Sequence, residues 1–181
     1  MRIISGSHKG RKITAPKQLP VRPTTDMAKE ALFNILHNAY FFEELSVLDL
    51  YAGTGNISYE FASRGCAHIV AVDASHRCVK FIAATSKALE FPILAIKAEV
   101  LDYLDRTLQQ FDIIFADPPY DKPIEEFQRI RELVFQKSLL REGGVLIIEH
   151  SKRTDLSGLE YFEQQRKYGG SVFSFFRMGG S

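Results

Sequence analysis

The chain has 181 residues, a net charge of +1 and a hydrophobic content of 45%. This length suits one domain with its own core, and the near-neutral charge excludes a uniformly polybasic nucleic-acid binder. The charge is nevertheless uneven, because residues 1–25 contain no Asp or Glu but hold Arg2, Lys9, Arg11, Lys12, Lys17 and Arg22. We expect this basic segment to face a polyanion.

The sequence also indicates the compartment of the protein and whether it binds a metal. Cys66 and Cys78 are the only cysteines and form no C-x-x-C motif, so we expect reduced thiols in a cytoplasmic protein. We expect no secretory signal, because the start lacks an apolar stretch, and no membrane-spanning run. The five histidines match no metal-binding spacing, so no metal is expected.

The first predicted element is a basic β-hairpin arm over residues 1–21. Short strands over Arg2–Ser5 and Arg11–Thr14 flank a turn at Ser7–Gly10. Three prolines then keep the connection extended: Pro16, Pro20 and Pro23. The rest of the chain, residues 22–181, is predicted to form the main domain, beginning with a helix that Thr24 or Thr25 caps and that runs to about Asn38.

Helices and strands alternate through most of this domain. Short continuous apolar runs predict strands over residues 47–50, 69–72, 92–96, 111–116 and 145–148. Helical patterns occupy residues 56–63, 75–89, 100–108 and 124–137, with Gly65 as the C-cap of the first, Ser75 as the N-cap of the second and Gly143-Gly144 as the stop after the last. This alternation is typical of parallel βαβ units with helices on both faces of the sheet.

The end of the chain departs from this pattern. Residues 161–168 and 172–178 are predicted to be two strands joined by a Gly169-Gly170 turn. Such a hairpin places the last strand antiparallel in a seven-stranded, mostly parallel sheet. A NAD-binding Rossmann domain does not need this ending.

A loop after the first strand of the alternating region predicts a ligand site. Asp49 lies near the strand end, and Ala52-Gly53-Thr54-Gly55 leads into the next helix with glycines that permit a close ligand approach. Ser58 replaces the third glycine of a dinucleotide fingerprint, which disfavours NAD. S-adenosylmethionine (SAM) has no pyrophosphate to cradle, and its ammonium group suits either Asp49 or the loop carbonyls.

Two acids follow the next two strands and extend this site. Asp73 can accept hydrogen bonds from ribose hydroxyls, and Glu99 can receive an adenine amino group. The predicted SAM pocket therefore contains Asp49, Ala52, Gly53, Thr54, Gly55, Asp73, Ala74, Glu99, Val100 and Asp117. With the C-terminal hairpin, this predicts a Rossmann-like SAM-dependent methyltransferase fold.

The segment Asp117-Pro118-Pro119-Tyr120 carries the predicted chemistry. Its prolines prevent helix formation and further strand pairing, so the segment is stiff. An exocyclic base amine is a poor nucleophile because its lone pair is delocalised into the ring. The Asp117 carboxylate and the Pro118 carbonyl can accept its two hydrogens as the nitrogen attacks a methyl group, while Tyr120 stacks on the base.

Over nearly its whole length, the chain resembles the RsmD family of bacterial 16S ribosomal RNA guanine-N2 methyltransferases. The resemblance is carried by Met1–Gly6, Lys9–Arg11, Arg22–Thr25, Glu30–Leu36, Asp49–Gly55, Ser63–Gly65, Asp73, Asp117–Tyr120 and Glu149-His150. It implies a monomeric SAM-dependent enzyme that modifies one guanine in an assembled or assembling small subunit. It also implies RNA contacts by Lys9, Arg11, Arg22 and Thr24.

Some positions depart from the family pattern, and two other functions stay open. Met27, Thr85, Glu99 and Tyr51 replace residues that are more usual there, and we expect them to tune binding. The Asp-Pro-Pro-Tyr segment is shared with adenine-N6 methyltransferases acting on DNA or RNA. An RNA-binding assembly factor with a vestigial pocket is the alternative without catalysis.

Overall fold

The computed structural model describes residues 1–19 and 21–179, so the predicted extended position of Pro20 lies outside the described residues. Its strands are β1 (Ser46–Leu50), β2 (His68–Asp73), β3 (Ile93–Lys97), β4 (Phe111–Ala116), β5 (Leu140–Ser151), β6 (Phe162–Tyr168) and β7 (Ser171–Phe176). They form one seven-stranded sheet in the order β3-β2-β1-β4-β5-β7-β6. The pairs among β1 to β5 are parallel, and β7 is antiparallel to both of its neighbours, as predicted.

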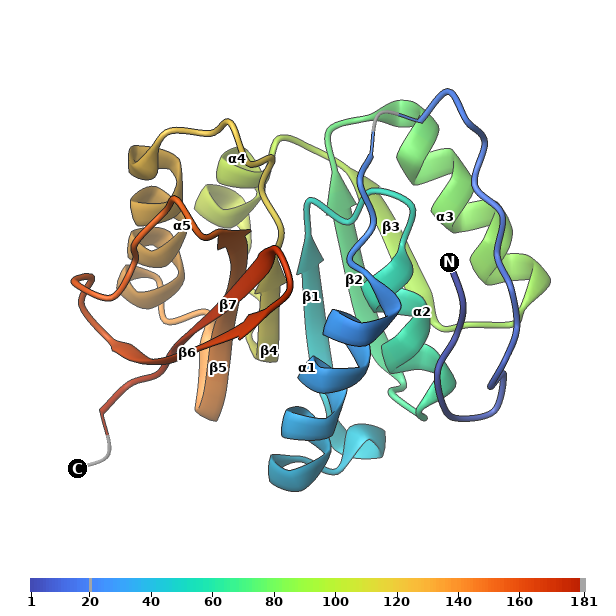
Figure 1. Ribbon diagram of the computed structural model, residues 1–181, viewed down its shortest axis with the longest axis horizontal. Helices are drawn as coiled ribbons and strands as arrows, with labels where there is room; N and C mark the ends of the chain where they lie inside the picture. The colour runs from blue at the N-terminus through green and yellow to red at the C-terminus, as the bar shows by residue number, and fades with distance from the viewer. Residues whose placement is uncertain (20, 180–181) are drawn as a thin grey trace.

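Helices cover both faces of this sheet (Figure 1). They are α1 (Asp26–Ala39), α2 (Asn56–Ser63), α3 (His76–Ala88), α4 (Val100–Arg106) and α5 (Ile124–Gln136), and a short 3-10 turn, η1, spans Phe42–Glu44. One core contains side chains of α1, α2 and α3, and the other contains side chains of α4 and α5. The predicted α/β fold with helices on both faces is confirmed.

Alternation along the central strands supplies both cores. On β4, Ile113 and Phe115 enter the core of α1 to α3, whereas Ile114 and Ala116 enter the core of α4 and α5. Because successive side chains of a strand point to opposite faces, a continuous apolar run is what a strand covered on both sides requires. The same alternation decides toward which face of the sheet the side chain of each strand-end acid points.

The two predicted helix caps use short polar side chains. The Thr25 hydroxyl accepts a hydrogen bond from the Ala28 N–H at 3.2 Å, and the Ser75 hydroxyl accepts one from the Cys78 N–H at 3.3 Å. These bonds satisfy N–H groups that have no partner within the first helical turn.

One predicted boundary is wrong. Gly143-Gly144 lie inside β5 and do not end the preceding helix, which stops at Gln136. Pairing between β4 and β5 is irregular there, and Gly143 has a φ of 76°. A Cβ on Gly144 would lie 2.9 Å from the Asp112 carbonyl oxygen, so glycine permits a bulge in which the backbones approach closely.

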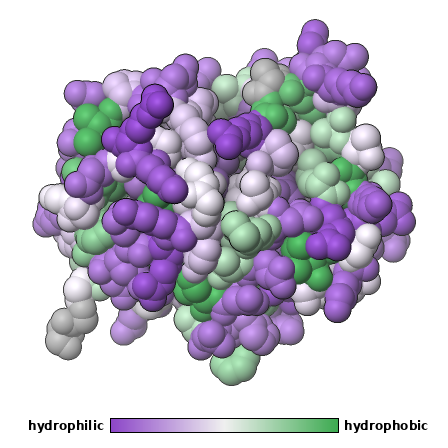
Figure 2. Space-filling model, viewed as in Figure 1, coloured by the Kyte–Doolittle hydropathy of each residue, from purple (hydrophilic) through white to green (hydrophobic). Residues whose placement is uncertain are grey.

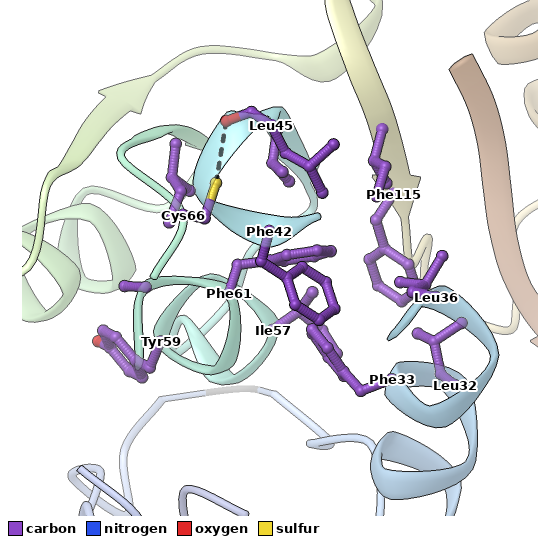
Figure 3. Close-up of a cluster of buried hydrophobic side chains, with 14 of the residues drawn as sticks. Leu32, Phe33, Leu36, Phe42, Leu45, Ile57, Tyr59, Phe61, Cys66 and Phe115 are labelled. Atoms are coloured by element: carbon purple, nitrogen blue, oxygen red, sulfur yellow. Dashed lines mark hydrogen bonds between the residues drawn. The ribbon is translucent and has the colours of Figure 1, made fainter. Parts of the chain in front are cut away.

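The aromatic cluster between α1 and α2 fixes the position of both helices (Figure 3). Phe33 and Phe61 meet edge-on with ring centroids 4.6 Å apart, and Phe42 lies about 6 Å from both rings. Beside them the Cys66 thiol donates to the Leu45 carbonyl at 3.2 Å. Cys66 and Cys78 are both buried and free.

The N-terminal segment folds back on itself as predicted, but as an antiparallel bridge between Arg2 and Lys12 and not as two regular strands. The Ile3 N–H donates to the Arg11 carbonyl at 2.9 Å, and the Ile13 N–H donates to the Met1 carbonyl at 3.0 Å. The segment is also docked on α2, because the Ile4 N–H donates to the buried Glu60 carboxylate at 2.9 Å and the Ser7 N–H donates to the Ser63 carbonyl at 2.7 Å. Bonds to the main domain therefore add to the pairing within the segment.

Hydrophilic residues cover most of the molecular face that is shown in Figure 2, and the hydrophobic residues on it form separate groups. Within residues 1–19 and 21–179, no helix has both the length and the apolar character needed to cross a membrane.

Two glycine substitutions test the docking of the N-terminal segment. Gly6 and Gly10 both have positive φ, but a Cβ on Gly6 would lie 1.9 Å from the Ser63 carbonyl oxygen, whereas a Cβ on Gly10 meets nothing within 4 Å. We expect Gly10→Ala to lower the free energy of unfolding by ~1–2 kcal/mol through backbone strain alone. Gly6→Ala should cost clearly more and expose the segment to proteases. Equal losses in urea unfolding would contradict the docking.

Candidate active site

A cleft of about 670 Å³ opens at the carboxyl ends of the parallel strands. Ligands bind at this edge in open α/β sheets, and the volume suits a small molecule. The cleft brings together most of the residues selected from the sequence: Asp49, Ala52, Gly53, Thr54, Asp73, Ala74, Glu99, Val100, Asp117, Pro118, Pro119 and Tyr120. Arg22 and Thr24 also line it.

Three selected residues do not line the cleft. Lys9 and Arg11 are exposed on the docked N-terminal segment. Gly55 is the N-cap of α2 with a φ of 89°, and a Cβ there would lie 2.6 Å from the Tyr59 ring. Gly55 therefore allows the loop to turn tightly over a buried ring.

Asp73 organises the glycine loop. One oxygen of its carboxylate accepts the Gly53 N–H at 2.9 Å, and the other accepts the Ser75 N–H at 2.9 Å. A carboxylate oxygen can accept a second bond, so Asp73 keeps capacity for two ligand hydroxyls. The loop between β1 and α2 is thus tied to the end of β2.

Asp49 is buried beneath this loop, with 2% of its surface exposed. The Ser58 hydroxyl donates to its carboxylate at 2.6 Å, but burial dominates and raises the pKa of Asp49 to about 7. Ser58 is the residue that interrupts the dinucleotide fingerprint. Its hydroxyl has a use that a glycine could not supply.

Asp117 follows β4 directly, between the ends of β1 and β5. Its pKa is raised well above the ordinary range by burial first, then by the carboxylates of Glu149 and Asp49, while the Arg22 guanidinium opposes the rise. Ala116 pairs with Leu50 on β1, and the Asp117 N–H donates to the Leu50 carbonyl at 3.3 Å. The acid is therefore held in register with the glycine loop.

Glu149 is a cleft residue to which sequence reasoning gave no role. It is 2% exposed, and its two oxygens accept the Thr24 hydroxyl at 2.6 Å and the Ser171 hydroxyl at 2.9 Å. Burial raises its pKa, and both hydroxyls and Arg22 oppose that rise. The available signal was its position after the apolar run of β5, because acids also stand at or near the ends of β1, β2 and β4.

His150 belongs to the opposite face. Its ring bonds the Ser174 hydroxyl at 2.7 Å and meets the Phe127 ring of α5 edge-on. Burial lowers its pKa. His150 therefore supports the fold and is not a cleft residue.

Tyr120 and Arg22 form the outer part of the site. The Arg22 guanidinium lies over the Tyr120 ring, 5.3 Å from its centroid, in a cation–π contact. The Tyr120 hydroxyl lies 3.4 Å from the Ser171 hydroxyl, which also donates to Glu149. The arrangement presents an aromatic face and a cation beside two acids. Within the described part of the chain, no group of three His, Cys, Asp or Glu residues is placed to hold a metal ion.

The chain is similar to known proteins over nearly its whole length. The family model described as conserved hypothetical protein 95 matches residues 1–177. The chain belongs to this family, the RsmD family. YlbH of Bacillus subtilis, named as an rRNA methyltransferase, is 34% identical over 164 residues, which cover 86% of this RsmD-family chain and 85% of YlbH.

Another relative of this RsmD-family protein is ribosomal RNA small subunit methyltransferase D of Escherichia coli K12, 32% identical over 130 residues that cover 70% of this chain and 63% of that protein. The solved structure of the Thermus thermophilus 16S rRNA N2 methyltransferase RsmC, in complex with AdoMet and guanosine, aligns with a TM-score of 0.65 and 23% identity. The alignment covers 84% of this chain and 43% of that one. The protein thus has the Rossmann-like α/β methyltransferase fold.

The burial of Asp49 predicts a pH-dependent stability difference. Its pKa of about 7 in the folded protein exceeds the ordinary value of 3.8, so the folded state holds more protons between these values. Stability from this group is full below about pH 4 and falls as pH rises to 7. The free energy of unfolding of Asp49→Asn, compared with that of wild type, should therefore rise by up to ~1.4 kcal/mol per pH unit in that window.

Urea unfolding of both proteins from pH 4 to 8, without ligand, measures this difference. Parallel stability curves for wild type and Asp49→Asn would show that Asp49 is ionised without cost in the folded state.

Proposed function

We propose that the protein transfers a methyl group from SAM to the exocyclic N2 amine of one guanine in 16S ribosomal RNA. The observation that carries the proposal is the Asp117–Tyr120 segment, held at the carboxyl end of β4 beside the glycine loop in one cleft. Family membership and the rRNA methyltransferase names of its relatives support the same substrate class.

The cleft fits SAM in size and in charge. The volume of about 670 Å³ is sufficient for it, and Asp73 and Glu99 stand at successive strand ends where ribose and adenine groups need acceptors. Asp49 and Asp117 supply negative charge where a cationic ligand is stabilised. When bound, SAM supplies an electrophilic methyl group on a sulfonium.

Asp117 and Pro118 act on the amine of the base. Pro118 is buried and Asp117 is half-buried, so the two acceptors have little freedom. Their oxygens accept the two amine hydrogens, which keeps the nitrogen lone pair directed at the methyl group. The amine loses one proton after the transfer, and the Asp117 carboxylate is placed to take it.

Tyr120 and Arg22 receive the base. Stacking on an aromatic ring contributes ~1–3 kcal/mol per base, which helps to offset the cost of unstacking it from the RNA. Arg22 lies over the Tyr120 ring, so an entering base contacts this guanidinium or displaces it.

In this proposal the RNA also contacts the protein outside the cleft. Thr24 and Arg22 lie at the cleft, and Lys9 and Arg11 extend the positive charge along the docked N-terminal segment. We propose that this segment contacts RNA phosphates, and that the monomeric protein acts in the cytoplasm on assembled or assembling small subunits.

Replacing the acid of the site tests this function. Asp117→Ala should lower methyl transfer to undermodified small subunits by ~10²–10⁴-fold, because the amine loses its acceptor. The loss should persist at saturating SAM, although SAM affinity also falls because the cleft loses a carboxylate, and cooperative unfolding should be retained. Asp102→Ala, which removes an exposed acid on α4 outside the cleft, is the matched control.

The product base is identified by mass spectrometry of the RNA methylated with labelled SAM. N2-methylguanine is expected, and N6-methyladenine would instead identify an adenine enzyme. Full activity of Asp117→Ala would reject the role of this acid.

A further inference from the structure

Glu149 and Asp117 stand side by side at the edge of the sheet. Ala116 on β4 pairs with Ile148 on β5 in parallel register, so the next residues on the two strands are neighbours. Phe115 and Ile147 enter the same core, and Asp117 and Glu149, two positions further on, point to that face. The cleft is lined by both acids.

The orientation of Glu149 is fixed by two other segments of the chain. Thr24, before α1, donates to one carboxylate oxygen, and Ser171, at the start of β7, donates to the other. Each oxygen has two lone pairs, so each keeps one acceptor position. A buried carboxylate held this way is a pre-organised acceptor for a further N–H group.

The Watson–Crick edges of the two amino-purines differ next to the amine. Guanine places a donor, N1–H, beside its N2 amine, whereas adenine places an acceptor, N1, beside its N6 amine. Flipped bases are read by hydrogen bonds to this edge. A pair of acids therefore matches the donor–donor edge of guanine, and an acid facing the adenine N1 would leave two acceptors opposed.

We propose that Glu149 accepts the N1–H of the target guanine while Asp117 accepts its N2 amine, so that Glu149 selects guanine over adenine. The inference rests on the proposed function and adds a specificity-determining residue to it. Burial raises the pKa of both acids and the Arg22 guanidinium opposes that rise, and N–H donors of a bound guanine would further favour the ionised, accepting form.

The test uses a base that keeps the amine and lacks the donor. 2-Aminopurine has the same 2-amine as guanine, but its N1 is an acceptor. Small subunits are reconstituted around 16S rRNA ligated to carry guanine or 2-aminopurine at the position that wild type methylates. Methyl transfer from labelled SAM is then measured with wild type, Glu149→Gln and Ser171→Ala.

We expect wild type to prefer guanine over 2-aminopurine by roughly tenfold or more, because the analogue leaves a buried charged acceptor unpaired. Glu149→Gln should reduce this preference to within about threefold, because its amide can also donate to an N1 acceptor. Ser171→Ala removes one bond to Glu149 but keeps the carboxylate, so it should retain most of the preference.

A positioning role alone would lower the rates on both bases and leave their ratio unchanged in Glu149→Gln, which would overturn the inference. A wild type that accepts both bases equally would also overturn it, and this comparison needs no variant. If wild type transfers no methyl group to guanine N2, the proposed function itself is wrong. SAM affinity of each variant, measured by calorimetry, confirms that the cleft is intact.

Discussion

The structure depends on a crowding of carboxylates at one edge of its sheet. Asp49 belongs to β1, Asp117 directly follows β4, and Glu149 belongs to β5. All three acids line one cleft. Burial and mutual repulsion raise the pKa of Asp117, and burial raises the pKa of the other two. Ionising several carboxylates so close together is unfavourable by itself. Binding a cation or a hydrogen-bond donor beside them makes their ionisation favourable.

The surrounding residues keep this group in place at a tolerable cost. Hydroxyls of Ser58, Thr24 and Ser171 donate to the buried acids. Thr24 is itself held in place by Asn56, whose side-chain amide donates to the Thr24 backbone carbonyl at 3.2 Å. The Asn56 side-chain oxygen in turn accepts a hydrogen bond from the buried Lys29 ammonium at 2.9 Å. Lys29 also donates to the Arg2 carbonyl, which ties the N-terminal segment to the edge of the cleft.

Much of the fold could be predicted from local patterns. Apolar runs such as 111–116 identify strands covered on both faces, and Ser75 and Thr25 identify helix starts, because these signals lie within a few residues of the feature. Gly143-Gly144 misled the prediction because glycine permits a bulge as well as a helix stop. The β4 carbonyl that decides between them is distant in sequence.

The candidate site divides in the same way. The Asp117–Tyr120 segment and the glycine loop carry their own signatures, so their residues were selected in advance. Glu149 is part of the family resemblance, but its local sequence indicates no role, which arises from pairing with β4 and from hydroxyls that lie 125 and 22 residues away. The docking of the N-terminal segment likewise depends on Glu60, a buried acid on α2 whose partner is a backbone N–H 56 residues earlier.

Proton release on SAM binding tests the role of the crowded acids most directly. Calorimetric titrations of the protein with SAM at pH 7 are repeated in buffers that differ in ionisation enthalpy. The account predicts a net release of protons, because a cation in the cleft stabilises carboxylates that are partly protonated without it, and a smaller release for Asp49→Asn. Binding heats that are independent of the buffer, or proton uptake, would contradict it.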